Sequence, residues 1–204
     1  MIQHHPSETT LAAYAGGTLP EGLALVVATH LYACTTCRRV TTIIESVGGA
    51  VLDDLAPAPM AADALALVLA RTERPMAREP QIARTTGLPP PLDACAFGPW
   101  RRVGFGLRWR PVTVGGRALA GLLEGMPGKA LPPHEHTGLE LTCVISGSFV
   151  DGDARYAAGD VAENEEGQPH CPVIEGAVPC LSFVATEGVR LRGWLGLAQR
   201  FLSE

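Results

Sequence analysis

Hydrophobic and polar residues follow a helical pattern in the first part of the chain. Ser7 is a suitable N-cap for a first helix, and Pro20 suits the start of a second. Gly48 and Gly49 follow a third apolar stretch and are expected to end it. The pattern predicts helices between Ser7 and Gly16 and over 21–33, 38–47 and 61–71.

After Trp100 the pattern changes to that of short strands. Apolar runs alternate with dipeptides that favour turns, namely Gly115-Gly116, Pro127-Gly128, Asp151-Gly152, Gly159-Asp160 and Glu175-Gly176. This spacing is typical of an all-β barrel or sandwich, with a closing helix expected at 197–202. Repeated prolines between the two patterns exclude long regular elements. The sequence therefore predicts two domains, a helical one at 1–72 and a β domain at 93–204, joined by a proline-rich linker at 73–92.

The composition supports a folded chain and narrows its partners. Of 204 residues, 47% are hydrophobic and 18% are charged, so the chain can bury a core. No apolar run is long enough to cross a membrane, and the N-terminus lacks the pattern of a signal peptide. We therefore expect a cytoplasmic protein with no membrane partner, whose six cysteines are reduced or bound to metal. The net charge of −5 and the scattered basic residues argue against direct contact with nucleic acid.

A first candidate metal site lies at the end of the second predicted helix. His30 and Cys34 are four residues apart and share a helix face, and Cys37 follows three residues later. Two thiolates and one imidazole are typical zinc ligands, and structural zinc takes four. Either His4 or His5 can supply the fourth ligand from the N-terminus. The alternative is that the two cysteines are small, half-buried thiols without a metal.

A second candidate site lies in the β part. His134 and His136 point to one face of a strand, and Glu140 keeps the same alternation. His170 follows later, after the Gly159-Asp160 turn signal. Three imidazoles and a carboxylate inside a small barrel suit a divalent transition metal such as Zn, Mn, Fe or Ni. The alternative is a set of surface histidines that precede a strand.

Four further cysteines, Cys95, Cys143, Cys171 and Cys180, lie in or near the predicted barrel. Strand alternation turns Cys143 away from Glu140, and Cys171 away from His170. All four fit the common use of cysteine as a small apolar filler. The alternative is that Cys171 or Cys180 is oxidised and reports oxidative stress.

Both candidate sites, in this order, resemble those of ChrR-type anti-sigma factors. The first resembles the zinc-binding anti-sigma domain, and this resemblance selects His5 over His4 as the fourth ligand. The second resembles the cupin pattern in a stretch from Gly128 through Glu140 to Gly147. The resemblance implies a small all-α zinc domain followed by an all-β cupin (jelly-roll) barrel.

The resemblance also implies a function without catalysis. The helical domain would bind and inhibit an extracytoplasmic-function sigma factor, and the cupin would sense singlet oxygen or an organic peroxide and release that partner. The helix at 61–71 would pack on the sigma factor, or else fold back on its own bundle. A homodimer through the cupin is a further expectation. The alternative function is a metal-dependent cupin enzyme, a dioxygenase or isomerase, with a regulatory zinc-binding helical domain.

Overall fold

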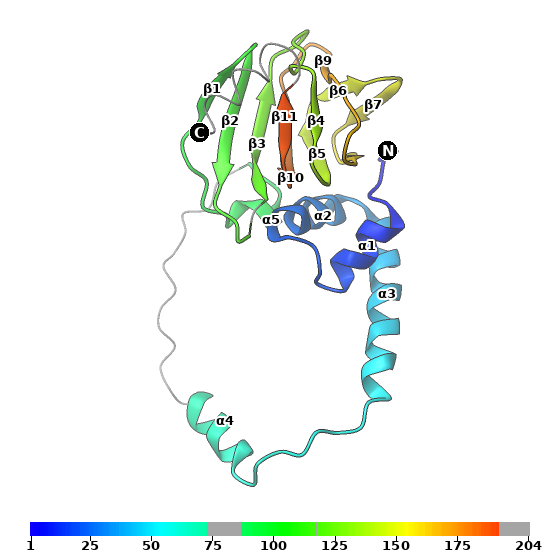
Figure 1. Ribbon diagram of the computed structural model, residues 1–204, viewed down its shortest axis with the longest axis vertical. Coiled ribbons are helices and arrows are strands. Elements are labelled where there is room, and N and C mark those ends of the chain that lie inside the picture. Colours follow the sequence, from blue (N-terminus) through cyan, green and yellow to red (C-terminus); the bar gives the residue numbers. More distant parts are fainter. Residues whose placement is uncertain (73–86, 117, 192–204) are drawn as a thin grey trace.

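The helices occupy one end of the molecule and the strands the other (Figure 1). The computed structural model describes residues 1–72, 87–116 and 118–191. The helices are α1 (Glu8–Ala15), α2 (Glu21–Ala33), α3 (Thr35–Asp53), α4 (Ala64–Thr72) and the short α5 (Pro90–Asp93). Most of the expected linker, and the helix expected at 197–202, lie outside the described residues. The predicted order, an α part followed by a β part, is confirmed.

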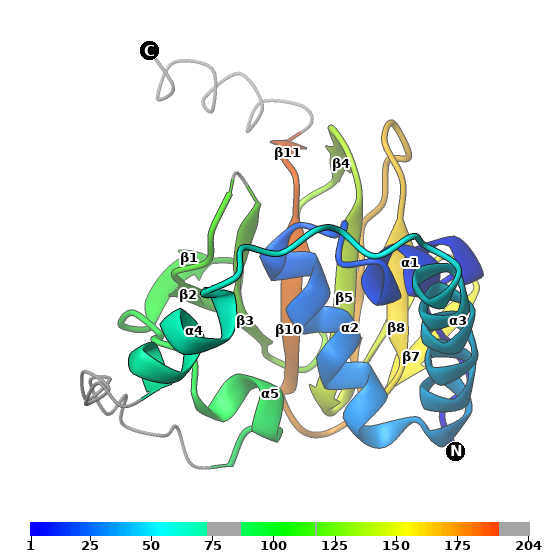
Figure 2. The same cartoon turned by 90° about the horizontal axis from the view of Figure 1, so that it is seen from below.

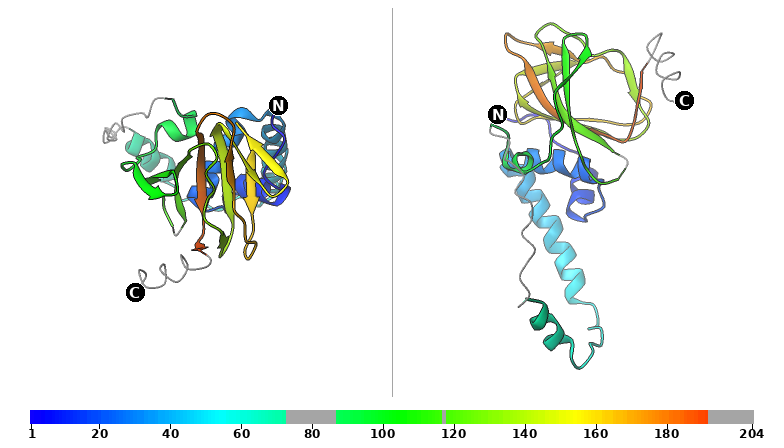
Figure 3. Two further views of the ribbon diagram at one scale, coloured as in Figure 1. Left: turned by 90° about the horizontal axis from the view of Figure 1, so that it is seen from above. Right: turned by 90° about the vertical axis from the view of Figure 1, so that its left-hand side faces the viewer.

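Eleven strands in the described ranges form the β part. They are β1 (Arg101–Gly104), β2 (Leu107–Val112), β3 (Leu119–Gly125), β4 (His134–His136), β5 (Glu140–Ser146), β6 (Ser148–Asp151), β7 (Ala154–Ala157), β8 (Val161–Asn164), β9 (Val173–Glu175), β10 (Cys180–Thr186) and β11 (Val189–Leu191). A six-stranded sheet has the order β1-β2-β3-β10-β5-β8, beside sheets β7-β6-β9 and β11-β4. All pairs within these sheets are antiparallel, and Figure 3 shows the strands curving round an interior.

Helix α3 departs from the prediction at both ends. It begins at Thr35 because the Cys34 thiol acts as its N-cap and accepts a hydrogen bond from the Cys37 amide. It then runs through Gly48 and Gly49 to Asp53, so the expectation that these glycines end it is wrong. Each glycine costs a helix only about 1 kcal/mol relative to alanine, which the rest of a long helix can offset. Helix α4 begins three residues later than the expected Ala61.

Helix α2 joins the two parts of the molecule. It lies across the outer face of the large sheet, over β5 and β10 (Figure 2). Its Leu23, Val26 and Val27 are fully buried in one hydrophobic cluster with Leu141 and Phe183 of the sheet. Burial of each such side chain contributes about 1.5–3 kcal/mol. The helical part and the β part therefore share a core.

The helix and the sheet come especially close at Gly22. A Cβ atom at this position would lie 3.0 Å from the Cβ of Ala120, which is tighter than ordinary packing. The missing side chain lets the first turn of α2 lie directly on β3. None of the described helices is long and apolar enough to span a lipid bilayer.

The N-terminal segment is bound to the turn between β7 and β8 through Asp160. One carboxylate oxygen of Asp160 accepts hydrogen bonds from the amides of Gln3 (2.7 Å) and His4 (3.1 Å). The other oxygen accepts one from the amide of Ala157 at 2.8 Å. Burial alone would raise the pKa of Asp160, but these backbone hydrogen bonds bring it below the ordinary value.

Replacement of Asp160 by alanine should release this segment. We expect D160A to lower the free energy of unfolding by about 2–4 kcal/mol at neutral pH, because it leaves three backbone donors without their charged acceptor. Because the pKa of Asp160 is lowered on folding, its contribution is complete above the unfolded pKa, near 3.9, and is lost as pH falls through the folded pKa. Urea unfolding at constant zinc concentration, repeated between neutral and acidic pH, measures both effects.

Asp153 offers the matched control, because it is exposed on the nearby turn between β6 and β7. Its replacement by alanine should leave the free energy of unfolding within about 0.5 kcal/mol of the parent value. An equal loss in D153A and D160A would contradict the role assigned to Asp160.

Candidate metal centres

The first cluster forms where three separate segments meet. His5 comes from the segment before α1, His30 from the last turn of α2, and Cys34 and Cys37 from the start of α3. The Nδ1 atom of His5 lies 3.4 Å from His30 Nε2, 3.4 Å from Cys34 Sγ and 3.3 Å from Cys37 Sγ. One donor atom from each residue fits within 4.8 Å of all the others. The structure thus brings together the four predicted residues, and their binding of a metal remains a prediction.

The β part orients one of these ligands. The Nδ1 atom of His30 lies 2.7 Å from the carbonyl oxygen of Gly159, in the turn between β7 and β8. A carbonyl oxygen can only accept, so Nδ1 carries the proton and donates it. The lone pair of His30 is therefore on Nε2, the atom that faces the cluster, which is the form that metal binding requires.

The donor set of the first cluster fits a zinc ion. Burial, together with the neighbouring Cys34, raises the pKa of the Cys37 thiol to about 12. Burial also lowers the pKa of His30, whose side chain is inaccessible to solvent. A bound dication would favour the thiolate forms of the two cysteines. Two thiols and two imidazoles at one point are the ligand types of structural zinc sites.

The two adjacent histidines of the N-terminus have different surroundings. The His5 ring faces the cluster, whereas the His4 ring packs against Tyr156 with the ring centroids 4.4 Å apart. The backbone of His4 also joins the sheet, because its carbonyl accepts a hydrogen bond from the amide of Val161 at 3.1 Å. Of the two histidines, the structure therefore places His5 in the cluster, and its role as a metal ligand stays a prediction.

The second cluster lies inside the β part. His134 and His136 come from β4, and Glu140 begins β5. His170 forms an isolated antiparallel β-bridge with His134. The Nε2 atom of His170 is 2.8 Å from His134 Nε2 and 2.9 Å from His136 Nε2. The Nδ1 atom of His136 lies 3.5 Å from Glu140 Oε2. The structure again gathers the four predicted residues, within 4.8 Å of one another.

The protons of this cluster point away from its centre. His134 Nδ1 donates to the carbonyl of Pro132 at 2.8 Å, and His170 Nδ1 donates to the Asp151 carboxylate at 2.5 Å. Each of these two rings in its neutral form therefore has its lone pair on Nε2, and the two Nε2 atoms face each other at 2.8 Å. Facing lone pairs repel unless a cation or a proton lies between them. This arrangement fits a transition-metal ion.

Burial disfavours the charged forms of His136 and Glu140 in the second cluster. Burial, together with the neighbouring His134 and His170, lowers the pKa of His136 to about 4. Burial raises the pKa of Glu140 to about 7. A bound dication would reverse this tendency and favour the Glu140 carboxylate. The carboxylate and the three imidazoles are therefore suited to binding a divalent metal ion.

Two residues that support the clusters, Asp151 and Gly159, are absent from the sequence-based sets. Each bonds the far nitrogen of a histidine and so sets the direction of its lone pair. Both belong to dipeptides that the sequence marks only as turns. Because their partners lie 19 and 129 residues away, the sequence carries no local signal for these contacts.

The remaining cysteines take separate positions. Cys143 is buried between the large sheet and α2, and Cys171 is exposed with its thiol donating to the carbonyl of Leu131. Both point away from the second cluster, as strand alternation predicts. Cys180 is buried at the start of β10 and lines a cavity. The oxidation of Cys171 or Cys180 stays a prediction.

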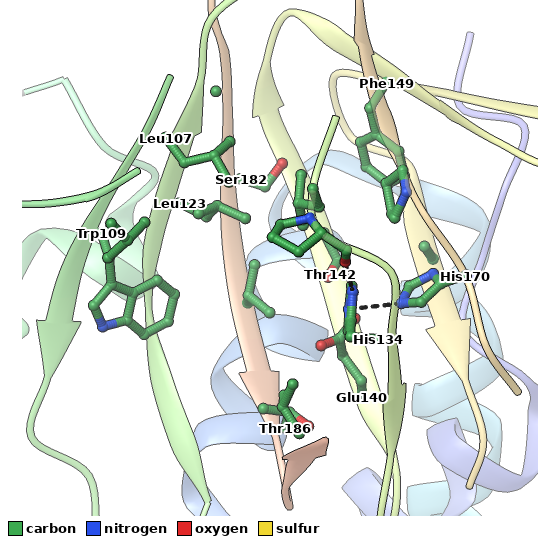
Figure 4. Close-up of a pocket in the computed structure, with 18 of the residues that line it drawn as sticks. Leu107, Trp109, Leu123, His134, Glu140, Thr142, Phe149, His170, Ser182 and Thr186 are labelled. Carbon is green, nitrogen blue, oxygen red and sulfur yellow. Dashed lines mark hydrogen bonds between the residues drawn. The ribbon is translucent and has the colours of Figure 1, made fainter. Parts of the chain in front are cut away.

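The second cluster opens onto a cavity of about 410 Å³ inside the β part. His134, Glu140 and His170 stand at one side of it, with Thr142 beside them (Figure 4). Most other wall residues are apolar, including Leu107, Trp109, Leu123, Phe149, Ile174 and Val184. The site therefore combines potential metal ligands with room for a small molecule.

Helices α3 and α4 present apolar side chains to solvent. Eight of them are more than half exposed: Ile43, Val47, Val51, Leu52, Leu65, Leu67, Val68 and Leu69. Helix α4 has no buried residue and stands apart from the other helices in Figure 1. In this structure α4 therefore does not fold back on its own bundle, which was one of the two expectations for it.

Comparison with known proteins identifies the family of the chain. Residues 94–190 match the family described as the ChrR cupin-like domain. The chain is 38% identical over 192 residues to the anti-sigma-E factor ChrR of Cereibacter sphaeroides, covering 91% of this chain and 90% of that protein. A crystal structure of Rhodobacter sphaeroides SigE in complex with the anti-sigma ChrR matches with a TM-score of 0.77 and 37% identity, covering 91% of this chain and 100% of that one. The chain belongs to the ChrR family of anti-sigma factors.

Proposed function

We propose that this protein binds and inhibits an extracytoplasmic-function sigma factor in the cytoplasm and releases it when the cupin part senses an oxidative signal. The observation that carries the proposal is the exposed apolar surface of α3 and α4, on a helix α3 that begins at the first cluster. Large uncovered apolar patches are typical of protein-binding surfaces. The relative in the solved complex is an anti-sigma factor bound to its sigma factor, which supports the same kind of partner here.

The first cluster would hold zinc and set the position of α3. Cys34 is both the N-cap of α3 and one of the four candidate ligands, so a bound ion would connect α3 to the end of α2 and to the N-terminal segment. Metal-binding free energy becomes folding free energy in a module of this size. The second cluster would hold zinc or another divalent ion such as Mn, Fe or Ni.

Strand β8 offers a direct route between the two clusters. It follows the Gly159-Asp160 turn that contacts His30 and the N-terminus, and its Ala162 and Asn164 line the cavity. The Asn164 amide lies 3.5 Å from Glu140 Oε1. A change at the second cluster that moves β8 would therefore reach the first cluster within one short strand. We propose this strand as the connection between sensing and release.

Co-expression with the cognate sigma factor tests the proposal. A stable complex that contains close to two metal ions per chain would support it. If no extracytoplasmic-function sigma factor binds and metal is confined to the second cluster, the protein is better explained as a metal-dependent cupin enzyme, a dioxygenase or isomerase. Turnover of small substrates with Fe or Mn restored would then be the next measurement.

Replacement of Cys34 by serine should remove sigma binding. Serine is a good N-cap, so C34S keeps the cap of α3 and removes only the thiolate ligand. We expect the zinc content to fall by about one ion per chain and the affinity for the sigma factor to fall by more than about a hundredfold. Metal analysis and co-purification measure the two effects.

Cys171 provides the control, because it is exposed and lies outside both clusters. C171S should keep both zinc and sigma binding. Full sigma binding by a zinc-free C34S protein would contradict the role of the first cluster.

Replacement of Asp151 by asparagine should affect the response to stress but not the resting inhibition. Asp151 orients His170 without belonging to the cluster, so we expect D151N to bind the cupin metal about 10–100-fold more weakly. A transcription reporter should show normal repression without stress and a reduced response to singlet oxygen or an organic hydroperoxide. The metal content of the purified variant gives the independent measurement.

The exposed Asp153 again supplies the control, since D153N should respond like the parent protein. Two results would count against the sensory role. A D151N protein that has lost resting inhibition would make the barrel part of the inhibitory surface. A full response by a variant that has lost the cupin metal would place the sensor elsewhere.

A further inference from the structure

The cavity inside the β part has the size and the walls of a small-molecule site. Its volume of about 410 Å³ lies in the range of roughly 300–1,000 Å³ that such sites occupy in proteins. His134, Glu140 and His170 lie on one side of it together with Thr142, whereas Leu107, Trp109 and Leu123 form the opposite side, with Ser182 next to Leu123 (Figure 4). The cavity is therefore more polar at one end than at the other.

The strand register gives this polarity a direction and a length. Trp109 on β2 pairs with Leu123 on β3, and Leu123 pairs with Ser182 on β10. Glu140 and Thr142 lie on β5, the next strand of the sheet. Three strand spacings separate β2 from β5, which is a path of roughly 14 Å along the sheet. An elongated ligand fits this geometry better than a compact polar one.

Some apolar side chains that line the cavity are exposed to solvent. Val103 and Phe105, at the β1–β2 hairpin, are 49% and 51% exposed. Leu119, at the other end of β3, is 62% exposed. Phe105 also has a backbone φ of 53°, in the left-handed region that disfavours bulky residues. The exposed ring and the strained backbone both cost free energy in the empty protein, and an apolar occupant that covers the ring would offset that cost.

We propose that the cavity binds an aliphatic molecule of medium chain length with one oxygen-bearing head group. The chain packs against Leu107, Trp109 and Leu123 and leaves past Phe105, and the head group faces the second cluster. A sugar or another polar ligand would lose its hydrogen bonds at the apolar wall. An oxygen-bearing head group can reach the side where His134, Glu140 and His170 line the cavity, which a pure hydrocarbon would not use. The binding of this molecule requires no sigma factor. Only the role of the molecule as part of the signal rests on the proposed function.

Calorimetric titration of the full-length, metal-loaded protein tests the proposal. Decanoic acid should bind with one molecule per chain and with a negative heat-capacity change, which marks the burial of apolar surface. Acetate has the same head group without the chain and should bind at least about a hundredfold more weakly. Decan-1-ol has the same chain as decanoic acid, so its affinity shows whether the site prefers a hydroxyl or a carboxylate head group. Equal affinity for acetate and decanoic acid, or the absence of saturable binding by both long-chain probes, would overturn the proposal.

Variants of the cavity separate binding from stability. In F105N the ring is lost, and asparagine tolerates a positive φ better than phenylalanine does. We expect about tenfold weaker binding of decanoic acid with an unchanged or higher unfolding temperature. L123W should weaken binding to a similar degree because it fills the apolar end. Val178 is exposed and outside the cavity, so V178N should bind like the parent protein.

Three results distinguish the remaining explanations. Parent-like binding by both folded cavity variants would overturn the proposal. Binding that appears only after removal of residues 192–204 would also overturn it, since this chain's own apolar end would then fill the cavity. Sigma binding is measured on the same samples. If the parent protein binds the sigma factor but no fatty acid, the result counts against this inference alone. If it binds no sigma factor, the result counts against the proposed function.

Discussion

The hydrogen bond from His30 to the carbonyl of Gly159 is the contact on which the geometry of the first cluster depends. It joins the last turn of α2 to the turn between β7 and β8, and it directs the lone pair of His30 into the first cluster. Its net contribution to stability is only about 0.5–1.5 kcal/mol, against about 10–16 kcal/mol for structural zinc in small modules. The bond therefore matters because it sets the direction of the His30 lone pair, and less because of the free energy that it contributes. A ring with its proton on Nε2 would not be a ligand, however close the other three donors lie.

The shared core explains why this contact is kept in place. Val26 and Val27 of α2 are fully buried in one cluster with Leu141 and Phe183 of the sheet, so α2 cannot move away from the sheet without exposing apolar surface. Helices α3 and α4 have the opposite character, because most of their apolar side chains are exposed. The molecule thus has a firmly packed half and a half with uncovered apolar faces. The cluster that includes Cys34 lies at the boundary between them, where a bound ion would fix how α3 leaves the packed half.

Local patterns made much of this structure predictable. Helical periodicity sets the relation of His30 to Cys34, and strand alternation sets that of His134 to His136, so both ligand groups follow from neighbouring residues. The choice between His4 and His5 does not, because an irregular segment has no fixed period; only the resemblance resolved it. Asp151 and Gly159 were seen as turn residues, but their roles depend on tertiary contacts with His170 and His30. The extension of α3 through Gly48 and Gly49 was missed because a helix tolerates glycine at a modest cost.

The size of the free-energy change that release requires limits how the proposed switch can work. Moving a two-state equilibrium from 1:99 to 99:1 takes about 5.5 kcal/mol of differential binding. One lost hydrogen bond to Gly159 supplies about a fifth of that. The whole turn supplies more, because Asp160 also holds Gln3, His4 and Ala157, and a displaced β8 would disturb these bonds together with the His30 contact. Since coupling between two sites is reciprocal, a sigma factor that tightens this turn must also favour the resting state of the cupin cavity. The signal therefore has to act on the turn as a unit rather than on any single ligand.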